Sequence, residues 1–290
     1  GVAGGAAQSA TEEYNGTSWA NGGSLPTATC APGGAGFQDA AIMAGGRTPT
    51  IVNTSFEYNG ASWSSGNTLN QARCDVHGAG TQNSALFVGG RNGPGLACAE
   101  LYDGTTFNVT NPINRATYGT SASGDSNASV WYGGYDLANA TSYIRTNEWN
   151  GLTFIEGNAM VVKKYASIGT GTQSSGLSVG GYTPSAVTCT EEYTKNFIPP
   201  YTTCVWTKGA GMIAGRYSGG GGGTTNAGLL FSGNIAPARV TCTEEYDGTV
   251  YTAGGAMITA RNNLAGGGTQ NAGIAAGGEP TNDGRTEEYN

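Results

Sequence analysis

Short apolar runs recur along the chain, and most of them end in a pair of glycines. The run over 40–44 ends at Gly45-Gly46, and similar runs end at Gly89-Gly90, Gly180-Gly181 and Gly277-Gly278. A short apolar run bounded by turn residues is typical of a buried strand. A polar segment with an aromatic residue follows, in most copies Glu-Tyr before Asn-Gly or Asp-Gly. These dipeptides predict a tight hairpin, because both central residues of such a turn need positive φ.

The aromatic residue of the polar segment reveals an internal repeat. It occupies positions 14, 58, 102, 149, 193, 246 and 289, at intervals of 44, 44, 47, 44, 53 and 43 residues. Self-similarity at such a period is the mark of a repeat architecture. We therefore expect one domain over residues 1–290, with repeats near 15–58, 59–102, 103–149, 150–193, 194–246 and 247–289.

A basic or polar anchor precedes a glycine-rich stretch in each unit. The anchors are Thr29, Arg73, Arg115, Lys164, Arg216 and Arg261. The second glycine of the pair follows 17 residues later in five units and 19 residues later in the unit from Arg115 to Gly134. Each unit thus predicts four short strands: glycine-rich, apolar, Glu-Tyr-bearing, and one begun by Trp or Phe. A four-stranded unit of this length is the blade of an all-β propeller.

The order of these signals resembles the kelch repeat family. Gly45-Gly46, Tyr58 and Trp63 match its double glycine, tyrosine and spaced tryptophan, as do Gly89-Gly90 and Tyr102 with Phe107. The resemblance covers the whole chain and implies a kelch-like β-propeller. The amino-acid sequence of the repeat is Thr-Glu-Glu-Tyr-Asn-Gly-Thr-Ser-Trp, with Gly-Thr-Gln turns. It is similar to kelch-type repeats in virion proteins of aquatic bacteriophages.

Seven blades are favoured by the count of elements, with six as the alternative. Seven double-glycine or equivalent elements, the first at Gly5, and seven segments of the Glu-Tyr type, the last at 287–289, accompany only six anchors. The chain begins inside a second strand and stops inside a third. The seven-blade interpretation leaves the first and last blades incomplete. The six-blade interpretation overlaps the two terminal strand pairs.

Composition and charge narrow the classes of function. Glycine makes up 51 of 290 residues, about 18%, which disfavours helices, since each interior glycine costs roughly 1 kcal/mol relative to alanine. The formal charge of −7 and the absence of a basic run argue against a nucleic-acid partner. The apolar runs fall far short of the roughly 20 residues that span a bilayer, so no membrane insertion is expected.

Loop lengths vary on one expected face of the disc. Strands alternate in direction, so the second-to-third and fourth-to-first connections share this face, where binding residues usually concentrate. The expected loops are Arg47–Asn53, Arg91–Ala97, Tyr135–Arg145, Tyr182–Thr188, Ile198–Trp206, Asn234–Val240 and Glu279–Arg285. Five aromatic residues there either stack on sugar rings or pack the loops: Tyr135, Tyr143, Tyr182, Tyr201 and Trp206.

The charged repeat positions have two interpretations. The anchors Arg73, Arg115, Lys164, Arg216 and Arg261 either ring the mouth of the channel and attract an acidic glycan or carboxylate, or pair structurally with the Glu-Glu strands. The Glu-Glu pairs recur in most blades, whereas an active site is normally a single asymmetric constellation. We therefore expect them to be structural.

No catalytic, metal or cofactor motif is found. His77 is the only histidine, so it would have to serve any Ser-His-Asp triad, and it cannot supply the histidines with which kelch-type galactose oxidases hold copper. Among six cysteines, Cys189 with Cys204 is the first candidate disulfide, and Cys74 with Cys98 is the second. The alternative is that the thiols are reduced and buried.

The expected function is binding without catalysis. The resemblance to phage repeats implies a virion surface or tail-fibre protein that contacts a host-surface glycan or protein, or another virion protein, in a virion-surface or extracellular setting. A secreted carbohydrate-active enzyme is one alternative. A module that self-assembles into a homo-oligomer through its terminal half-blades is another.

Overall fold

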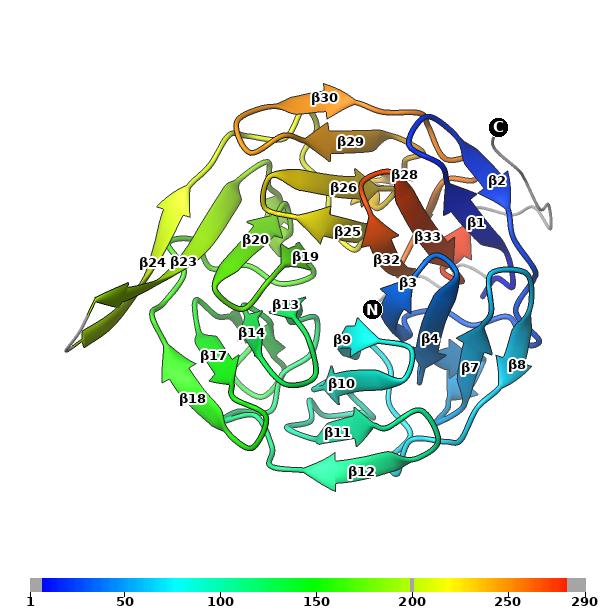
Figure 1. The fold of residues 1–290 in the computed structure, drawn as a ribbon, viewed down its shortest axis with the longest axis horizontal. Coiled ribbons are helices and arrows are strands. Elements are labelled where there is room, and N and C mark those ends of the chain that lie inside the picture. Colours follow the sequence, from blue (N-terminus) through cyan, green and yellow to red (C-terminus); the bar gives the residue numbers. More distant parts are fainter. Residues whose placement is uncertain (1–6, 199–200, 281–290) are drawn as a thin grey trace.

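The chain forms six four-stranded antiparallel sheets around a central axis, as a computed structural model of residues 7–198 and 201–280 shows (Figure 1). No helix occurs in these two ranges. The inner strands of neighbouring sheets contact one another in a closed circle. The all-β prediction is confirmed, and the protein is a β-propeller. It has six blades, so the favoured count of seven is wrong and the alternative is correct.

Each blade is a meander from the channel to the rim. Blade 1 contains β3 (Gly33–Phe37), β4 (Ala40–Ala44), β7 (Ser55–Tyr58) and β8 (Trp63–Ser65); blade 2 contains β9 (His77–Thr81), β10 (Ser84–Val88), β11 (Ala99–Tyr102) and β12 (Phe107–Thr110). Blade 3 contains β13 (Ser121–Gly124), β14 (Ser129–Tyr132), β17 (Thr146–Trp149) and β18 (Phe154–Gly157); blade 4 contains β19 (Ile168–Gly171), β20 (Ser175–Val179), β23 (Thr190–Ile198) and β24 (Tyr201–Lys208). Blade 5 contains β25 (Gly220–Thr224), β26 (Ala227–Phe231), β29 (Thr243–Tyr246) and β30 (Tyr251–Ala253); blade 6 contains β32 (Ala265–Thr269), β33 (Ala272–Ala276), β1 (Thr11–Tyr14) and β2 (Trp19–Asn21).

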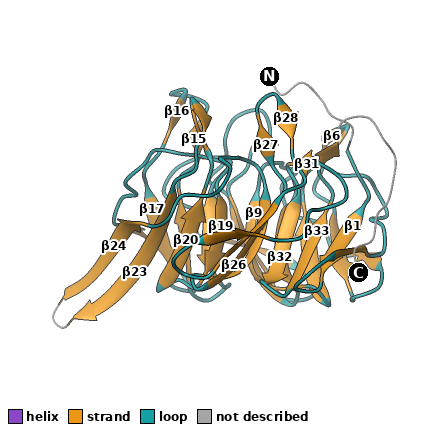
Figure 2. Ribbon diagram, turned by 90° about the horizontal axis from the view of Figure 1, so that it is seen from above, coloured by secondary structure: helices purple, strands orange, loops and turns teal. Residues whose placement is uncertain are grey.

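Two-residue strands project from the face where the second strands end, which we call the loop face (Figure 2). They pair as β5 (Arg47–Thr48) with β6 (Thr50–Ile51), β15 (Tyr135–Asp136) with β16 (Thr141–Ser142), β21 (Tyr182–Thr183) with β22 (Ser185–Ala186), β27 (Asn234–Ile235) with β28 (Ala238–Arg239), and β31 (Arg261–Asn262) with β34 (Glu279–Pro280). The variable connections therefore gather on one face, as expected from the alternation of strand direction.

Blade 6 joins the two ends of the chain. Strand β1 pairs with β33, with Thr11 opposite Ala276 and Tyr14 opposite Gly273. The first Glu-Tyr segment thus completes the last blade, which is why counting both ends gave one blade too many. The elements at Gly5 and 287–289 lie outside the described residues. Because β1 and β2 pair within the chain, they do not form the open half-blade on which the self-assembly alternative rested.

A circle of backbone hydrogen bonds closes the propeller at the loop face. One residue per blade sits just before the inner strand with φ between 51° and 62° and donates its N–H to the equivalent carbonyl of a neighbouring blade, over 2.8–3.3 Å. The six residues are Ala31, Asp75, Gly119, Ala166, Ser218 and Asn263. A non-glycine residue in this conformation costs roughly 1–2 kcal/mol, so the surrounding structure imposes it.

A second circle of hydrogen bonds shows that the anchor of blade 3 is Thr117 and not the predicted Arg115. The second glycine of each pair donates to the anchor carbonyl of the next blade, as Gly46 does to Arg73 over 2.8 Å. In blade 3 the acceptor is Thr117, reached by Gly90 over 3.1 Å, and not Arg115. Thr117 also restores the 17-residue spacing to Gly134. The arginine two residues earlier displaced the alignment because it matched the residue type of the other anchors.

Tyrosine and glutamate join neighbouring blades. The hydroxyls of Tyr14, Tyr58, Tyr102, Tyr193 and Tyr246 donate to the second glutamate of the preceding blade: Glu245, Glu13, Glu57, Glu148 and Glu192. Only blade 3 differs, because Trp149 replaces the tyrosine, and the preceding blade carries Leu101 in place of the glutamate. Leu101 packs against the apolar cluster that contains Trp149. The two partners therefore change together from a polar to an apolar pair.

Glycine in the inner strands allows close approach at the axis. A Cβ atom on Gly169 would lie 2.3 Å from the carbonyl oxygen of Ala122 in the neighbouring blade. At this position any larger residue would force the blades apart. Part of the glycine excess is therefore a packing requirement of the inner strands, and another part supplies the positive φ of the double glycines and hairpin turns.

The hairpin of β23 and β24 extends beyond the disc, away from the loop face (Figures 1 and 2). It is paired from Glu191 opposite Lys208 out to Ile198 opposite Tyr201. Within the predicted loop at Ile198–Trp206, Ile198 and residues 201–206 belong to β23 and β24 and do not form a loop on the loop face. Thr194 and Lys195, where a turn was predicted, lie within β23 opposite Val205 and Cys204.

Candidate functional site at the mouth of the channel

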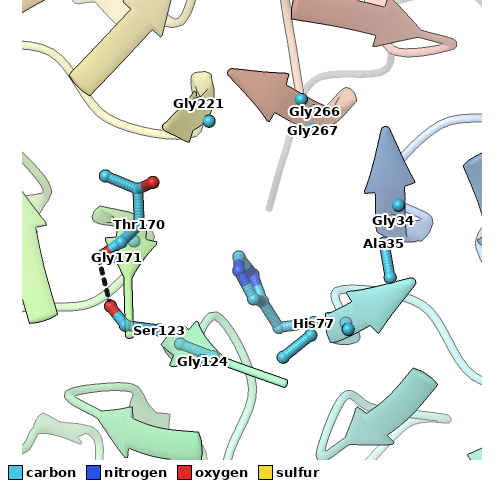
Figure 3. Close-up of a pocket in the computed structure, with 18 of the residues that line it drawn as sticks. Gly34, Ala35, His77, Ser123, Gly124, Thr170, Gly171, Gly221, Gly266 and Gly267 are labelled. Atoms are coloured by element: carbon cyan, nitrogen blue, oxygen red, sulfur yellow. Dashed lines mark hydrogen bonds between the residues drawn. The ribbon is translucent and has the colours of Figure 1, made fainter. Parts of the chain in front are cut away.

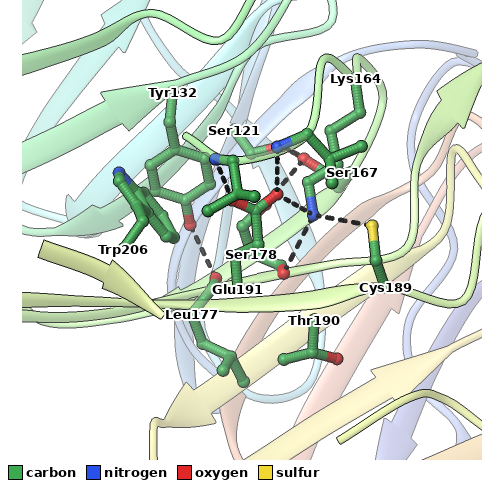
Figure 4. Close-up of polar contacts among 12 residues, drawn as sticks. Ser121, Tyr132, Lys164, Ser167, Leu177, Ser178, Cys189, Thr190, Glu191 and Trp206 are labelled. Carbon is green, nitrogen blue, oxygen red and sulfur yellow. Dashed lines mark hydrogen bonds and ion pairs between the residues drawn. The ribbon is translucent and has the colours of Figure 1, made fainter. Parts of the chain in front are cut away.

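Four of the five predicted anchors are buried inside their own blades. Arg73 lies 3.2 Å from Glu100, Lys164 lies 3.5 Å from Glu191, and Arg261 lies 2.9 Å from Glu12; Arg216 pairs with Glu244. These eight side chains are at most 3% exposed. Figure 4 shows Lys164 between Glu191, the carbonyl of Ser178 and the sulfur of Cys189. At these four positions the anchors pair with glutamate, as the structural interpretation predicted. Because they are buried, a ligand at the mouth does not touch them.

The two remaining blades lack both partners of the pair. In blade 1 the equivalent residues are Thr29 and Phe56, and in blade 3 they are Thr117 and Asn147. A buried charge without a partner is strongly destabilising, so the cation and the carboxylate are gained or lost together. Burial lowers the pKa of Arg73 and Arg261 against the opposing effect of their glutamates, and Arg261 also donates to the carbonyls of Ala10 and Gly277.

Arg115 lies instead on the loop face. It pairs with Asp136 over 3.0 Å, its side chain is 42% exposed, and its guanidinium lies 4.9 Å from the ring centre of Tyr143. Tyr143 and Asn139 both donate to Asp136, and these bonds, with Tyr143 first, hold the pKa of that carboxyl below its usual range. The predicted residues Arg115 and Tyr143 are therefore together, in a loop cluster of blade 3.

Five tyrosines form a continuous arc at the mouth of the channel. They stand directly before the hydrogen-bonded circle or directly after the double glycine, where Tyr118 bridges to Tyr135, Tyr165 to Tyr182, and Tyr217 to Asn234. Ring centres are 5.6 Å apart for Tyr118 and Tyr135, 5.0 Å for Tyr135 and Tyr165, 5.6 Å for Tyr165 and Tyr182, and 4.9 Å for Tyr182 and Tyr217. Each of the five is partly exposed. Burial, and then its tyrosine neighbours, raise the pKa of Tyr165 to about 12.

Charged residues occupy the same positions in the other half of the mouth. Arg47, Arg91 and Glu279 follow the double glycines of blades 1, 2 and 6. Arg91 pairs with Asp75 over 2.5 Å and lies 5.0 Å above the ring of Tyr118, which joins the two halves. Glu279 accepts from Arg47 over 3.2 Å and from Arg239 over 3.1 Å. The mouth is therefore aromatic across blades 3, 4 and 5. It is charged across blades 6, 1 and 2, together with Arg239 of blade 5.

Below the mouth lies a cavity of about 590 Å³ lined by the six inner strands. About half of the lining residues are glycine, and Ser123 donates to the carbonyl of Thr170 from one blade to the next. His77 projects into this space and carries the only imidazole of the chain (Figure 3). Burial lowers the pKa of His77 to about 4, so the imidazole is neutral at pH 7.

The predicted aromatic residues separate into four groups. Tyr135 and Tyr182 belong to the arc, and Tyr143 lies in the Arg115 cluster. Trp206 is only 6% exposed, and its indole donates to Thr146 of blade 3 within the core. It is therefore a core residue and not a ligand contact. The side chain of Tyr201 lies outside the described part of the structure.

Sequence reasoning missed Tyr118, Tyr165 and Tyr217, which make up most of the arc. They occupy the position directly after the anchor, where Cys30 and Cys74 stand in blades 1 and 2. Tyr165 and Tyr217 directly follow the anchors Lys164 and Arg216, which were registered correctly, but their repetition was not recognised. With Thr117 instead of Arg115 as the anchor of blade 3, Tyr118 takes the same position, and the tyrosine recurs in three consecutive blades.

Neither predicted disulfide is formed by the described residues. Cys74, Cys98 and Cys189 are free thiols. The backbone of Cys204 pairs with Lys195, six residues along β23 from Cys189, or about 20 Å at roughly 3.3 Å per residue. Bridged cysteines need Cα atoms within about 7 Å. The thiol of Cys98 donates to Gln71 over 2.8 Å, and burial raises the pKa of Cys74 to about 12.

Comparisons with known proteins place the fold. No family model and no curated protein matches the sequence. The solved structure titled "Structure of YjhT" is similar, with a TM-score of 0.76 at 10% sequence identity, covering 91% of this chain and 94% of that one. At this identity the similarity shows the propeller fold alone. In the ranges 7–198 and 201–280, no helix is long and apolar enough to cross a membrane, and no three His, Cys, Asp or Glu side chains gather as metal ligands.

Proposed function

We propose that the protein is a non-catalytic binding module that recognises a glycan at the mouth of its channel. The observation that carries the proposal is the arc of five partly exposed tyrosines across blades 3 to 5. Tyrosine offers a flat apolar ring and a hydroxyl, and it loses little conformational entropy on binding. Sugar rings present a matching apolar face bordered by hydroxyl groups.

The scaffold supports recognition by a rigid surface. Every arc residue is adjacent to a backbone bridge, and the circle of hydrogen bonds runs through Gly119, Ala166 and Ser218 beside it. The Tyr217 hydroxyl also accepts a 2.8 Å hydrogen bond from Asn234. A surface held in its binding conformation before the ligand arrives has less entropy to lose. This arrangement favours affinity without movement of the loops.

The non-catalytic part of the proposal rests on how the acidic groups at the mouth are used. Asp75 is held by Arg91, and Glu279 is held by Arg47 and Arg239. Sugar hydrolysis normally needs two carboxyl groups that flank the scissile bond with opposite protonation. Carboxylates engaged by arginine are poor proton donors. The competing function, a carbohydrate-active enzyme, predicts release of sugar products and is tested in the same experiment.

A virion-surface or tail-fibre role is supported by the resemblance of the repeats to phage virion proteins. In that setting the partner is a host-surface glycan or protein, or another virion protein. The extracellular location belongs to the same proposal. Expression of the complete protein in its virus, followed by labelling of intact particles with an antibody to the loop face, tests the location directly.

A glycan array with purified protein, followed by calorimetric titration of the best ligand, tests the binding function. Tyr165→Ala removes the centre of the arc, and we expect a loss of affinity of at least about tenfold. Tyr143→Ala, on the same face but outside the arc, is the matched control and should leave affinity within about twofold. Binding to protein but to no glycan contradicts the proposal, and so does turnover of a bound glycan.

A further inference from the structure

Among the residues 7–198 and 201–280, the charged half of the mouth holds more arginine than carboxylate. Arg47, Arg91 and Arg239 stand there, and their acidic partners within these ranges are Asp75 and Glu279. This excess of positive charge lies in a chain whose formal net charge is −7. A local charge opposite to that of the whole molecule marks a place where an anionic group gains attraction.

One carboxylate serves two of these arginines. Glu279 is fully buried, and its two oxygens accept from Arg47 at 3.2 Å and Arg239 at 3.1 Å. Arg239 also donates from Nε to Asn262 over 2.5 Å. The Arg47 guanidinium has five N–H donors, of which one bonds to Glu279, and the thiol of Cys30 also interacts with it. The Arg47 side chain is 30% exposed, so part of it is accessible from solvent.

The positions of these groups fit a ligand that spans the mouth. Arg47 belongs to blade 1, and in a circle of six blades the opposite one is blade 4, which carries Tyr165 and Tyr182 (Figure 1). A glycan of several sugars that lies across the mouth, with one sugar on the tyrosines, can therefore place an acidic sugar at the guanidinium pair. A planar guanidinium binds a carboxylate with two parallel hydrogen bonds, which neutral hydroxyl groups cannot reproduce.

We propose that the mouth selects an acidic glycan, with Arg47 as the residue that binds its carboxylate and Arg239 beside it. The inference rests on the proposed glycan-binding function and adds the ligand class. Glu279 acts as a positioning residue: it holds the two guanidinium groups in place and leaves part of their charge unneutralised. The buried anchors take no part, since their side chains do not reach the mouth.

Matched sugar pairs test the inference. The probes are galactose and galacturonate oligomers, and glucose and glucuronate oligomers, titrated into the whole protein at low salt. We expect each uronate to bind at least about tenfold more tightly than its neutral partner, and this preference should weaken as salt rises. Arg47→Gln should remove most of the preference, so that each uronate binds no more than about twofold more tightly than its neutral partner.

Two further variants make the result specific. Arg145→Gln alters another arginine, 42% exposed and paired with Glu156, and should leave the preference intact. Glu279→Gln removes the shared negative charge and should raise the preference for uronates. Equal binding of neutral and acidic sugars, or an unchanged preference in Arg47→Gln, overturns this inference but not the proposed function. Binding of no sugar of either kind overturns the proposed function itself.

Discussion

Arginine pairs with carboxylate in two neighbouring regions of this propeller, with opposite consequences. Inside the blades, Arg216 and Glu244 are almost without solvent contact. On the loop face, Arg115 and Arg47 keep 42% and 30% of their side chains exposed beside Asp136 and Glu279. The same chemistry fixes strands together where water is excluded and remains available to a ligand where water reaches it. Burial, more than residue type, separates structure from recognition.

The largest expected effect comes from breaking one buried pair. Glu244→Ala leaves the Arg216 guanidinium buried without its carboxylate, and we expect a loss of about 3–5 kcal/mol in the free energy of unfolding. Urea denaturation of the variant and the wild type measures it. A loss below about 1 kcal/mol would show that the buried pairs stabilise the fold no more than the exposed pairs do.

Replacing both members of that pair should cost far less. Blade 1 carries Thr29 and Phe56 at these positions, so Arg216→Thr with Glu244→Phe copies an arrangement that the propeller already contains. A buried ion pair exchanged for packed residues is often close to neutral, and we expect the double variant to lie within about 2 kcal/mol of wild type. A double-mutant cycle measures the coupling energy between Arg216 and Glu244. If the losses of the two single variants simply add in the double variant, the expectation is contradicted.

Acid should destabilise the channel beneath the mouth through His77. Its pKa is about 4 in the folded protein against an ordinary value of 6.5, so between these values the unfolded chain binds the proton and the folded one does not. Stability therefore falls as pH falls from about 6.5 to 4. Between pH 6 and pH 5 the wild type should lose about 1 kcal/mol more than His77→Ser, which copies Ser121 of blade 3. Equal losses in the two proteins would place the imidazole in a fully hydrated environment.

The smallest effect is expected at the exposed pair of the loop face. Arg115→Gln removes the ion pair with Asp136 but leaves a side chain that is able to hydrogen-bond, and exposed pairs contribute roughly 0.2–1 kcal/mol. Denaturation at low and high salt should show a difference under about 1 kcal/mol that shrinks as salt rises. A loss as large as that of Glu244→Ala would abolish the distinction between the two regions.

Much of the fold was readable from the repeat, and much less of the site. Double glycines, Glu-Tyr segments and Asn-Gly turns predicted the four strands of each blade because they are local signals of strand and turn. The mouth was only partly anticipated. Tyr135 and Tyr182 follow a double glycine and were found, whereas Tyr118 was hidden by the wrong anchor, Arg115, and Tyr165 was not recognised although it directly follows the anchor Lys164. Trp206 was assigned to a loop, although the hairpin of β23 and β24 continues past it.

The sequence by itself determined the blade, its period and the chemistry at each repeat position, since strand alternation, glycine and turn residues act over a few neighbouring residues. Only the tertiary structure decided the rest. The number of blades is six because β1 pairs with β33 from the other end of the chain. The anchors are buried because each cation meets a glutamate two strands away, and the mouth is aromatic on one side and charged on the other. These outcomes depend on which residues meet across blades, and that is fixed when the ring closes.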